Sequence, residues 1–221
     1  MPLESASTRA PSPMSQPDSE TEIRDTRRRA RRLSPVARRT QLLQAAVRVV
    51  AARGLNASGL HQEIAASAGV ANATVFFYFA TRDNLIDAVL GDVERELELL
   101  AEGILLREGS ARQNALDLLF AFADWVGTHQ DHARIWLEWG TATRESYWPR
   151  YLASIAWHVR LWSTAMTHAR PRPATAKALD AHDVAQLIVG SGHMIVQMMF
   201  AGRTRETVDH YIEALISAVL D

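Results

Sequence analysis

The stretch that decides the fold lies at residues 63–90 and reads EIAASAGVANATVFFYFATRDNLIDAVL. A short helical segment at 63–68 is interrupted by Gly69, and a second short segment at 72–79 follows. Thr81 then begins a long amphipathic run. Two short helices joined by a glycine turn are typical of the helix-turn-helix motif, whose second helix enters the major groove of DNA. The stretch therefore predicts a DNA-binding module.

Charge is distributed unevenly along the chain, although the net charge is only −1. Residues 24–39 contain eight arginines and one acid, whereas residues 54–221 carry 13 basic and 20 acidic side chains, a net of −7. A basic segment before an acidic body predicts that one end of the molecule meets a polyanion. The run precedes the motif as the minor-groove arm of homeodomains does, so we expect Arg29, Arg31 and Arg32 to contact DNA. A solvated charge run is the alternative.

The composition excludes several classes of protein. There are no cysteines, which excludes disulfides, thiolate metal sites and a cysteine nucleophile. No apolar stretch approaches the roughly 20 residues that span a bilayer, and the N-terminus lacks the hydrophobic core of a signal peptide. We therefore expect a cytoplasmic protein without membrane contact, and neither a metal nor a cofactor.

The rest of the chain has a helical period. Ser34 and Pro35 are typical of a helix start, and Gly54 of its end. After the motif, helices are expected at 81–104, 110–126, 131–141, 147–169, 180–200 and 204–220. No alternating run indicates a strand, so the fold class is all-α, with nine helical segments. We divide it into a disordered tail at 1–27, an arginine arm with the DNA-binding domain at 28–80, and a helical domain at 81–221.

The second helix of the motif can be divided into two faces. Spacing of three to four residues predicts that Val75, Phe76 and Phe79 face the small core. The residues left toward the groove are Asn72, Ala73, Thr74, Phe77 and Tyr78. Asn can pair with adenine, Thr with a base or phosphate, and Tyr with a phosphate, whereas Phe77 can make only apolar contacts, for instance with a thymine methyl or a sugar. Thr81 offers a hydroxyl to a phosphate. A plain aromatic core is the alternative for the aromatic residues, and it stays open for Phe77.

With these residues in view, the chain resembles the TetR family of bacterial transcriptional regulators. The resemblance rests on Arg53-Gly54-Leu55, Ile64-Ala65, Ala68-Gly69-Val70, Thr74-Val75, Tyr78-Phe79 and the TRDNL segment at 81–85. The segments RLSP at 32–35, ATVFFYFATRDNLIDAVL at 73–90 and WLEWGTATRESYWP at 136–149 are more similar to quorum-sensing regulators of the LuxR/HapR/SmcR type. The resemblance implies a homodimer that binds double-stranded DNA at a pseudo-palindromic operator and has a C-terminal ligand-binding and dimerisation domain.

The chain departs from that pattern in two places. The connection between Gly54 and Glu63 is one residue longer, which predicts a displaced first helix in the motif. Phe77 stands where those regulators typically carry asparagine. The loss of that amide predicts a different base preference.

The last two helical segments carry more apolar residues than the core of one protomer needs. These residues are Val184, Leu187, Ile188, Ile195, Val196, Met198, Met199, Phe200, Ile212, Leu215, Ile216 and Val219. A helix that is apolar nearly all round must be buried on both sides, so we expect a four-helix homodimer interface across a two-fold axis. An ordinary buried helix is the alternative.

Aromatic residues in the helical body suggest a ligand pocket. Phe122, Trp136, Trp139, Trp157 and Trp162 are grouped there, with Gly190 and Gly192 thinning one wall. An aromatic core is the alternative on sequence alone. The resemblance places the pocket lining at Leu97, Leu100, Phe122, Trp136, Ile155, Val159 and Gly192. That lining is apolar, so the expected ligand is small, hydrophobic and uncharged.

Two other classes of protein compete with a regulator. His129, Asp131 and His132 could belong to a metal-binding enzyme, but the cluster falls at a helix boundary and no third ligand is placed by spacing. A helical dimer without DNA binding leaves the arginine arm unexplained. His193, on an apolar helix, is expected to be a satisfied core histidine. We therefore expect no enzyme and no catalytic residues.

Overall fold

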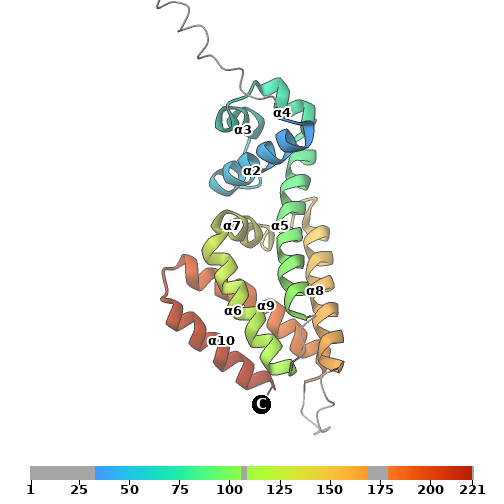
Figure 1. Ribbon diagram of the computed structural model, residues 1–221, viewed down its shortest axis with the longest axis vertical. Helices are drawn as coiled ribbons and strands as arrows, with labels where there is room; N and C mark the ends of the chain where they lie inside the picture. The colour runs from blue at the N-terminus through green and yellow to red at the C-terminus, as the bar shows by residue number, and fades with distance from the viewer. Residues whose placement is uncertain (1–32, 106–108, 169–178, 221) are drawn as a thin grey trace, which may run out of the picture.

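The computed structural model describes residues 33–105, 109–168 and 179–220, which form nine helices and no strand (Figure 1). The helices are α2 (Pro35–Arg53), α3 (Leu60–Ala68), α4 (Asn72–Tyr78), α5 (Arg82–Leu105), α6 (Ala111–Thr128), α7 (Gln130–Trp139), α8 (Trp148–His168), α9 (Ala181–Phe200) and α10 (Arg205–Leu220). For the described residues the all-α prediction is confirmed.

The predicted helix caps are confirmed. Ser34 Oγ accepts from the Ala37 amide at 3.2 Å, and Gly54 ends α2 with a φ of 91°, a value that favours glycine. Asp180 and Asp183 form a reciprocal capping box at the start of α9. Side chains of the expected type therefore satisfy backbone groups at these helix ends.

The first helix of the motif begins at Leu60, so its predicted start at Glu63 is wrong. Gly59, with a φ of 75°, sets the turn before it. Leu60 and Ile64, four residues apart, are 2% and 0% exposed, so burial of Leu60 extends the helix toward its N-terminus. The EIAASA segment begins only at Glu63, so its apolar spacing does not reveal that the helix already starts at Leu60.

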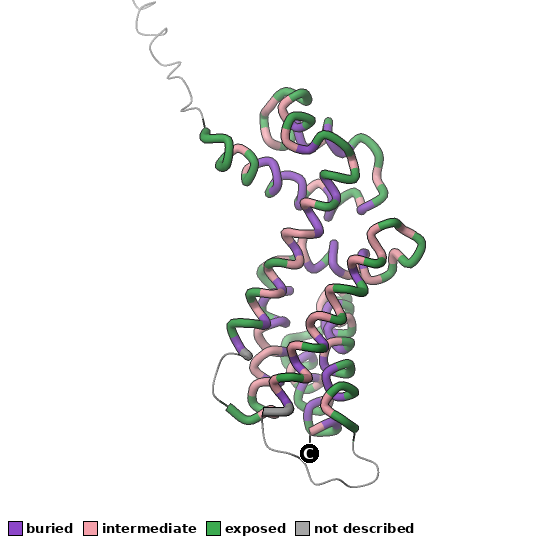
Figure 2. Tube along the Cα trace, turned by 90° about the vertical axis from the view of Figure 1, so that its right-hand side faces the viewer, coloured by how far each residue is buried: buried purple, intermediate pink, exposed green. Residues whose placement is uncertain are grey.

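The helices form two connected groups (Figure 1). Helices α2, α3 and α4 lie at one end, α5 runs from them along the molecule, and α6, α8, α9 and α10 make up the opposite part. Helix α7 packs against α2, α5 and α9. Buried positions follow the inner faces of the helices in Figure 2, so one hydrophobic core extends through both groups.

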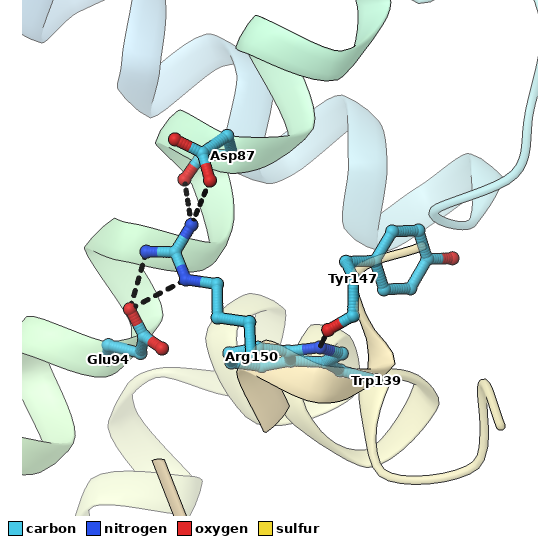
Figure 3. A network of polar contacts seen from close by, with 5 residues as sticks. All are labelled: Asp87, Glu94, Trp139, Tyr147 and Arg150. Carbon is cyan, nitrogen blue, oxygen red and sulfur yellow. Dashed lines mark hydrogen bonds and ion pairs between the residues drawn. The ribbon is translucent and has the colours of Figure 1, made fainter. Parts of the chain in front are cut away.

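Polar contacts tie the two groups together. Glu138 on α7 accepts from the Leu55 amide at 2.8 Å, just after α2 ends. Arg150 on α8 donates through Nε to Glu94 at 3.0 Å and also pairs with Asp87, both on α5 (Figure 3). Charge-assisted hydrogen bonds of this kind have defined geometry, so they fix how the motif sits on the body.

Candidate DNA-binding surface and cavity

A glycine turn sets the angle between α3 and α4. Gly69 lies in the left-handed region, with φ 65° and ψ 37°. The amide of Val70 donates back to the Ala65 carbonyl at 3.0 Å, as in a Schellman helix end. Val75 on α4 and Phe79, directly after its last residue, are 0% and 1% exposed, which confirms that they face the core. The turn and this apolar pair therefore determine which face of α4 reaches solvent.

Phe76 does not face the core, and that prediction is wrong. Its side chain is 45% exposed and stacks on the ring of His61, with 4.2 Å between ring centroids. His61 is itself nearly buried and donates through Nε2 to the Phe79 carbonyl at 2.8 Å. Because the imidazole fills the space beneath α4, Phe76 covers it from outside.

The outward face of α4 is centred on Phe77, whose side chain is 81% exposed. Val75 and Phe79 mark the buried side, so Phe77, midway between them, lies on the opposite side of the helix. A groove of about 560 Å³ lies between this face and the start of α2. It is lined by Leu33, Pro35, Arg38, Ala73, Thr74, Phe77 and Tyr78. The structure thus brings four of the predicted DNA-facing residues together.

Arg38 is a lining residue of this groove that the sequence patterns do not single out. It donates through Nη1 to Gln41 at 2.7 Å, and Gln41 in turn donates to the Ala68 carbonyl at 3.3 Å. These bonds hold a cation beside the outward face of α4. Its membership of the arginine-rich run is the signal that could have identified it.

The other predicted DNA-binding residues lie apart from the groove. Asn72 is exposed at the start of α4, in a second hollow with His61, Phe76 and Arg82. Thr81 is exposed and accepts through Oγ1 from the Asn84 amide at 3.1 Å, so its hydroxyl proton remains available to a phosphate. Arg29, Arg31 and Arg32 lie outside the described residues.

A narrow cavity of about 60 Å³ lies among α5, α6, α7, α8 and α9. It is lined by Leu97, Leu100, Ala101, Leu118, Leu119, Phe122, Trp136, Ile155, His158, Trp162, Ile188, Val189 and Gly192. Six of the seven predicted pocket residues therefore meet around one cavity, and Val159 is buried without lining it.

Some of the aromatic and glycine residues that we assigned to the pocket wall lie at this cavity, and others do not. Phe122, Trp136, Trp162 and Gly192 line the cavity, whereas Trp139 and Trp157 do not. A Cβ atom on Gly192 would lie 3.2 Å from Trp136, so the missing side chain makes room for the indole. Gly190 is exposed, and a Cβ atom added to it would meet nothing within 4 Å, so its predicted place in the wall is wrong. The two glycines, two residues apart, lie on different sides of α9.

Polar groups in and near the cavity are neutral or unpaired. Burial lowers the pKa of His158, whose Nδ1 donates to the Ser154 carbonyl at 2.9 Å. The indole N–H of Trp162 is buried without an acceptor among the described residues. The His193 ring lies 4.1 Å from the Trp136 ring, tilted by 31°, and His193 hydrogen-bonds the Tyr151 hydroxyl at 2.9 Å, as expected of a satisfied core histidine. Burial lowers the pKa of His193 and raises that of Tyr151 to about 12.

The histidine cluster at the α6–α7 boundary makes other contacts. His132 lies 3.2 Å from Asp92 on α5, and His129 lies 2.9 Å from the Thr128 hydroxyl. Within the described ranges no three acidic, histidine or cysteine side chains are placed to hold a metal ion. These side chains connect α5 to the start of α7.

Helices α9 and α10 bury most of their predicted apolar residues within one protomer. Ile188, Ile195 and Ile212 are 0% exposed. Leu187 and Met194, on the outer side of α9, are 43% and 46% exposed. This outer side is an apolar surface that the protomer leaves uncovered.

The chain is similar to known proteins in sequence. Residues 42–89 match the family model "Bacterial regulatory proteins, tetR family". The chain is 30% identical over 190 residues to the HTH-type transcriptional regulator LuxR of Vibrio harveyi, covering 86% of this chain and 90% of that protein. None of the described helices is both long and apolar enough to cross a membrane.

Solved structures share the fold. A cysteine mutant of the TetR family regulator CifR, complexed with 26-bp operator DNA, superposes with a TM-score of 0.69 at 19% identity, covering 85% of this chain and 99% of that one. The regulator FadR from Bacillus subtilis, in complex with stearoyl-CoA, superposes with a TM-score of 0.65 at 16% identity, covering 82% and 97%. The chain belongs to the TetR family of DNA-binding transcriptional regulators.

Proposed function

We propose that the protein binds a pseudo-palindromic operator as a homodimer, with α4 of each protomer in successive major grooves about 34–36 Å apart. The observation that carries this is the outward face of α4, where Phe77 is 81% exposed beside Thr74, Tyr78 and Arg38. Residues 28–80, with the arginine arm, are proposed to form the DNA-binding part, ahead of a ligand-binding and dimerisation part at 81–221. Selection of DNA from random duplexes by the purified protein tests the proposal.

The dimer is proposed to form through α9 and α10. Exposed Leu187 and Met194 give α9 an apolar outer side that a second copy can cover. Covering the same patch on both subunits requires a two-fold axis, and such an axis gives the operator its palindromic form.

We expect Asn72→Ala to reduce discrimination at particular base pairs while leaving binding to unrelated DNA unchanged. Asn72 is exposed at the start of α4, and an asparagine amide can pair bidentately with adenine. A good bidentate pair contributes about 1–3 kcal/mol of discrimination against the wrong base. Competition binding with single-base operator variants measures this, and equal loss on every sequence would show that Asn72 does not read a base.

A small, uncharged, hydrophobic ligand is proposed to occupy the cavity and regulate DNA binding. The lining is apolar apart from neutral His158 and the indole N–H of Trp162, which could donate to a ligand acceptor. At about 60 Å³ the cavity must widen to admit a typical ligand. The ligand would bind the state with the widened cavity more tightly than the state described here. It would therefore shift the protein toward the widened state and change its affinity for DNA. Similarity to LuxR supports a role in quorum sensing.

We expect Gly192→Val to weaken binding of N-phenyl-1-naphthylamine, an uncharged apolar dye, by about tenfold or more. Even the first carbon of a new side chain would lie 3.2 Å from Trp136 and 3.4 Å from Phe122. A lost contact of about 1.4 kcal/mol corresponds to tenfold in affinity. Dye fluorescence titration measures the change.

Gly103→Val is the matched control, because Gly103 lies in α5 with nothing within 4 Å of the added carbon. Both variants place a β-branched residue in a helix, so their effects on helix propensity are similar. Unchanged dye affinity in Gly192→Val would place the dye outside this cavity.

A further inference from the structure

Phe77 is a large apolar side chain that the protomer leaves in solvent at the centre of the DNA-facing surface. It is 81% exposed, and its ring meets the edge of Tyr78 at 5.2 Å between centroids. Phe79, two residues along, is 1% exposed, so the small core is already filled by another aromatic ring. Phe77 is therefore not needed to fill the small core, and its ring is free to contact a partner.

The surroundings of Phe77 are apolar on the side of the groove. Ala73, one turn earlier, presents a methyl group, and Thr74 beside it presents a methyl and a hydroxyl. Leu33 and Pro35 form the opposite wall. The sequence of α4, NATVFFY, contains no arginine, lysine or glutamine. Helix α4 can therefore bury apolar groups of DNA but itself carries none of the arginine or lysine side chains that usually pair with guanine; Arg38, which lines the same groove, comes from α2.

The major groove presents one apolar group that distinguishes a base, which is the 5-methyl group of thymine. Alanine, the threonine methyl and phenylalanine are the side chains that contact it. We propose that Phe77 is a specificity-determining residue that packs on a thymine 5-methyl group in each half-site. This inference rests on the proposed operator binding. We assign the polar atoms around it, on Thr74, Tyr78 and Arg38, to contacts with the flanking phosphates, which would fix the register of α4.

The test removes the methyl group without changing base pairing. Operators are first selected with the full-length protein, and each thymine of a half-site is then replaced in turn by deoxyuridine. At one position the replacement should weaken binding by about fourfold in one half-site and about 15-fold in both, as expected for loss of one buried methyl group at each contact. Fluorescence anisotropy at fixed salt measures the affinities.

Variants assign the methyl effect to the side chain. In Phe77→Ala the same deoxyuridine operator and the thymine operator should bind equally, and in Phe77→Leu part of the difference should remain. Leu99→Ala is the control, because Leu99 is also a large exposed side chain, at 59%, on α5 away from the groove. It should retain the full methyl effect.

Two results would overturn the inference and are distinguishable. If no operator is selected, the proposed function fails and the inference fails with it. If an operator is selected but no thymine position is sensitive to deoxyuridine, or Phe77→Ala shows the same sensitivity as the unchanged protein, DNA binding stands and the role of Phe77 is refuted.

Discussion

Trp139→Ala is expected to lower the free energy of unfolding by about 3–5 kcal/mol, the range measured for removal of large buried aromatic residues. Trp139 is 0% exposed. Its indole N–H donates to the Tyr147 carbonyl at 3.0 Å (Figure 3). Its ring also meets the edge of the Tyr151 ring at 5.6 Å between centroids. The substitution leaves a cavity at the end of α7 and removes one of two hydrogen bonds that the Tyr147 carbonyl accepts, the other coming from the Tyr151 amide at 3.3 Å.

The same substitution should also weaken operator binding. Trp139 directly follows Glu138, which accepts from the Leu55 amide and so holds the end of α2. Urea unfolding at one fixed protein concentration measures the stability change, because the stability of a dimer depends on concentration. Trp148→Ala is the control, since Trp148 is only half-buried and stacks on the outer side of Tyr151. Equal losses in the two variants would contradict the structural role given to Trp139.

Replacing Arg29, Arg31 and Arg32 together by alanine is expected to weaken binding to every duplex, specific or not, by at least about a hundredfold at roughly 0.15 M salt. Each phosphate contact contributes about 0.9 to the slope of log affinity against log salt, so three lost contacts lower it by about 2.7 for each protomer. Arginine carries this charge almost alone, because the chain has a single lysine, Lys177.

The salt slope separates direct phosphate contact from a general effect of net charge. A triple alanine variant at Arg144, Arg160 and Arg203 removes the same charge from exposed positions of the body. Its slope should stay within about 1 of the unchanged protein. If both triple variants lose the same slope, the arginine arm acts only through long-range attraction and does not touch DNA.

The helical order could be predicted from the sequence because local chemistry determines it. Ser34, Ser110 and Asp180 each accept a hydrogen bond from an amide three residues on, as their residue types at helix starts predict. Gly54 and Gly69 end their helices with positive φ values. These interactions span a few residues, so a sequence pattern is sufficient to reveal them.

The errors arise where distant residues decide the outcome. Phe76 is displaced from the core by His61, which α3 contributes 15 positions earlier, and no periodicity within α4 reveals that ring. Gly190 and Gly192 look equivalent in sequence, yet only Gly192 meets Phe122 and Trp136 from other helices. Arg38 becomes part of the groove because α2 and α4 converge there. Tertiary packing determines all three.

Operator binding by two α4 helices is tested most directly by selection of DNA from random duplexes. The full-length protein is used at roughly 0.15 M salt, where unspecific attraction to phosphates is screened. We expect a pseudo-palindrome whose half-site centres are about 10–10.5 base pairs apart or a multiple of that, as two α4 helices on one face of DNA require. Recovery of unenriched sequences, or of a single asymmetric site bound by one protomer, would contradict this mode of binding.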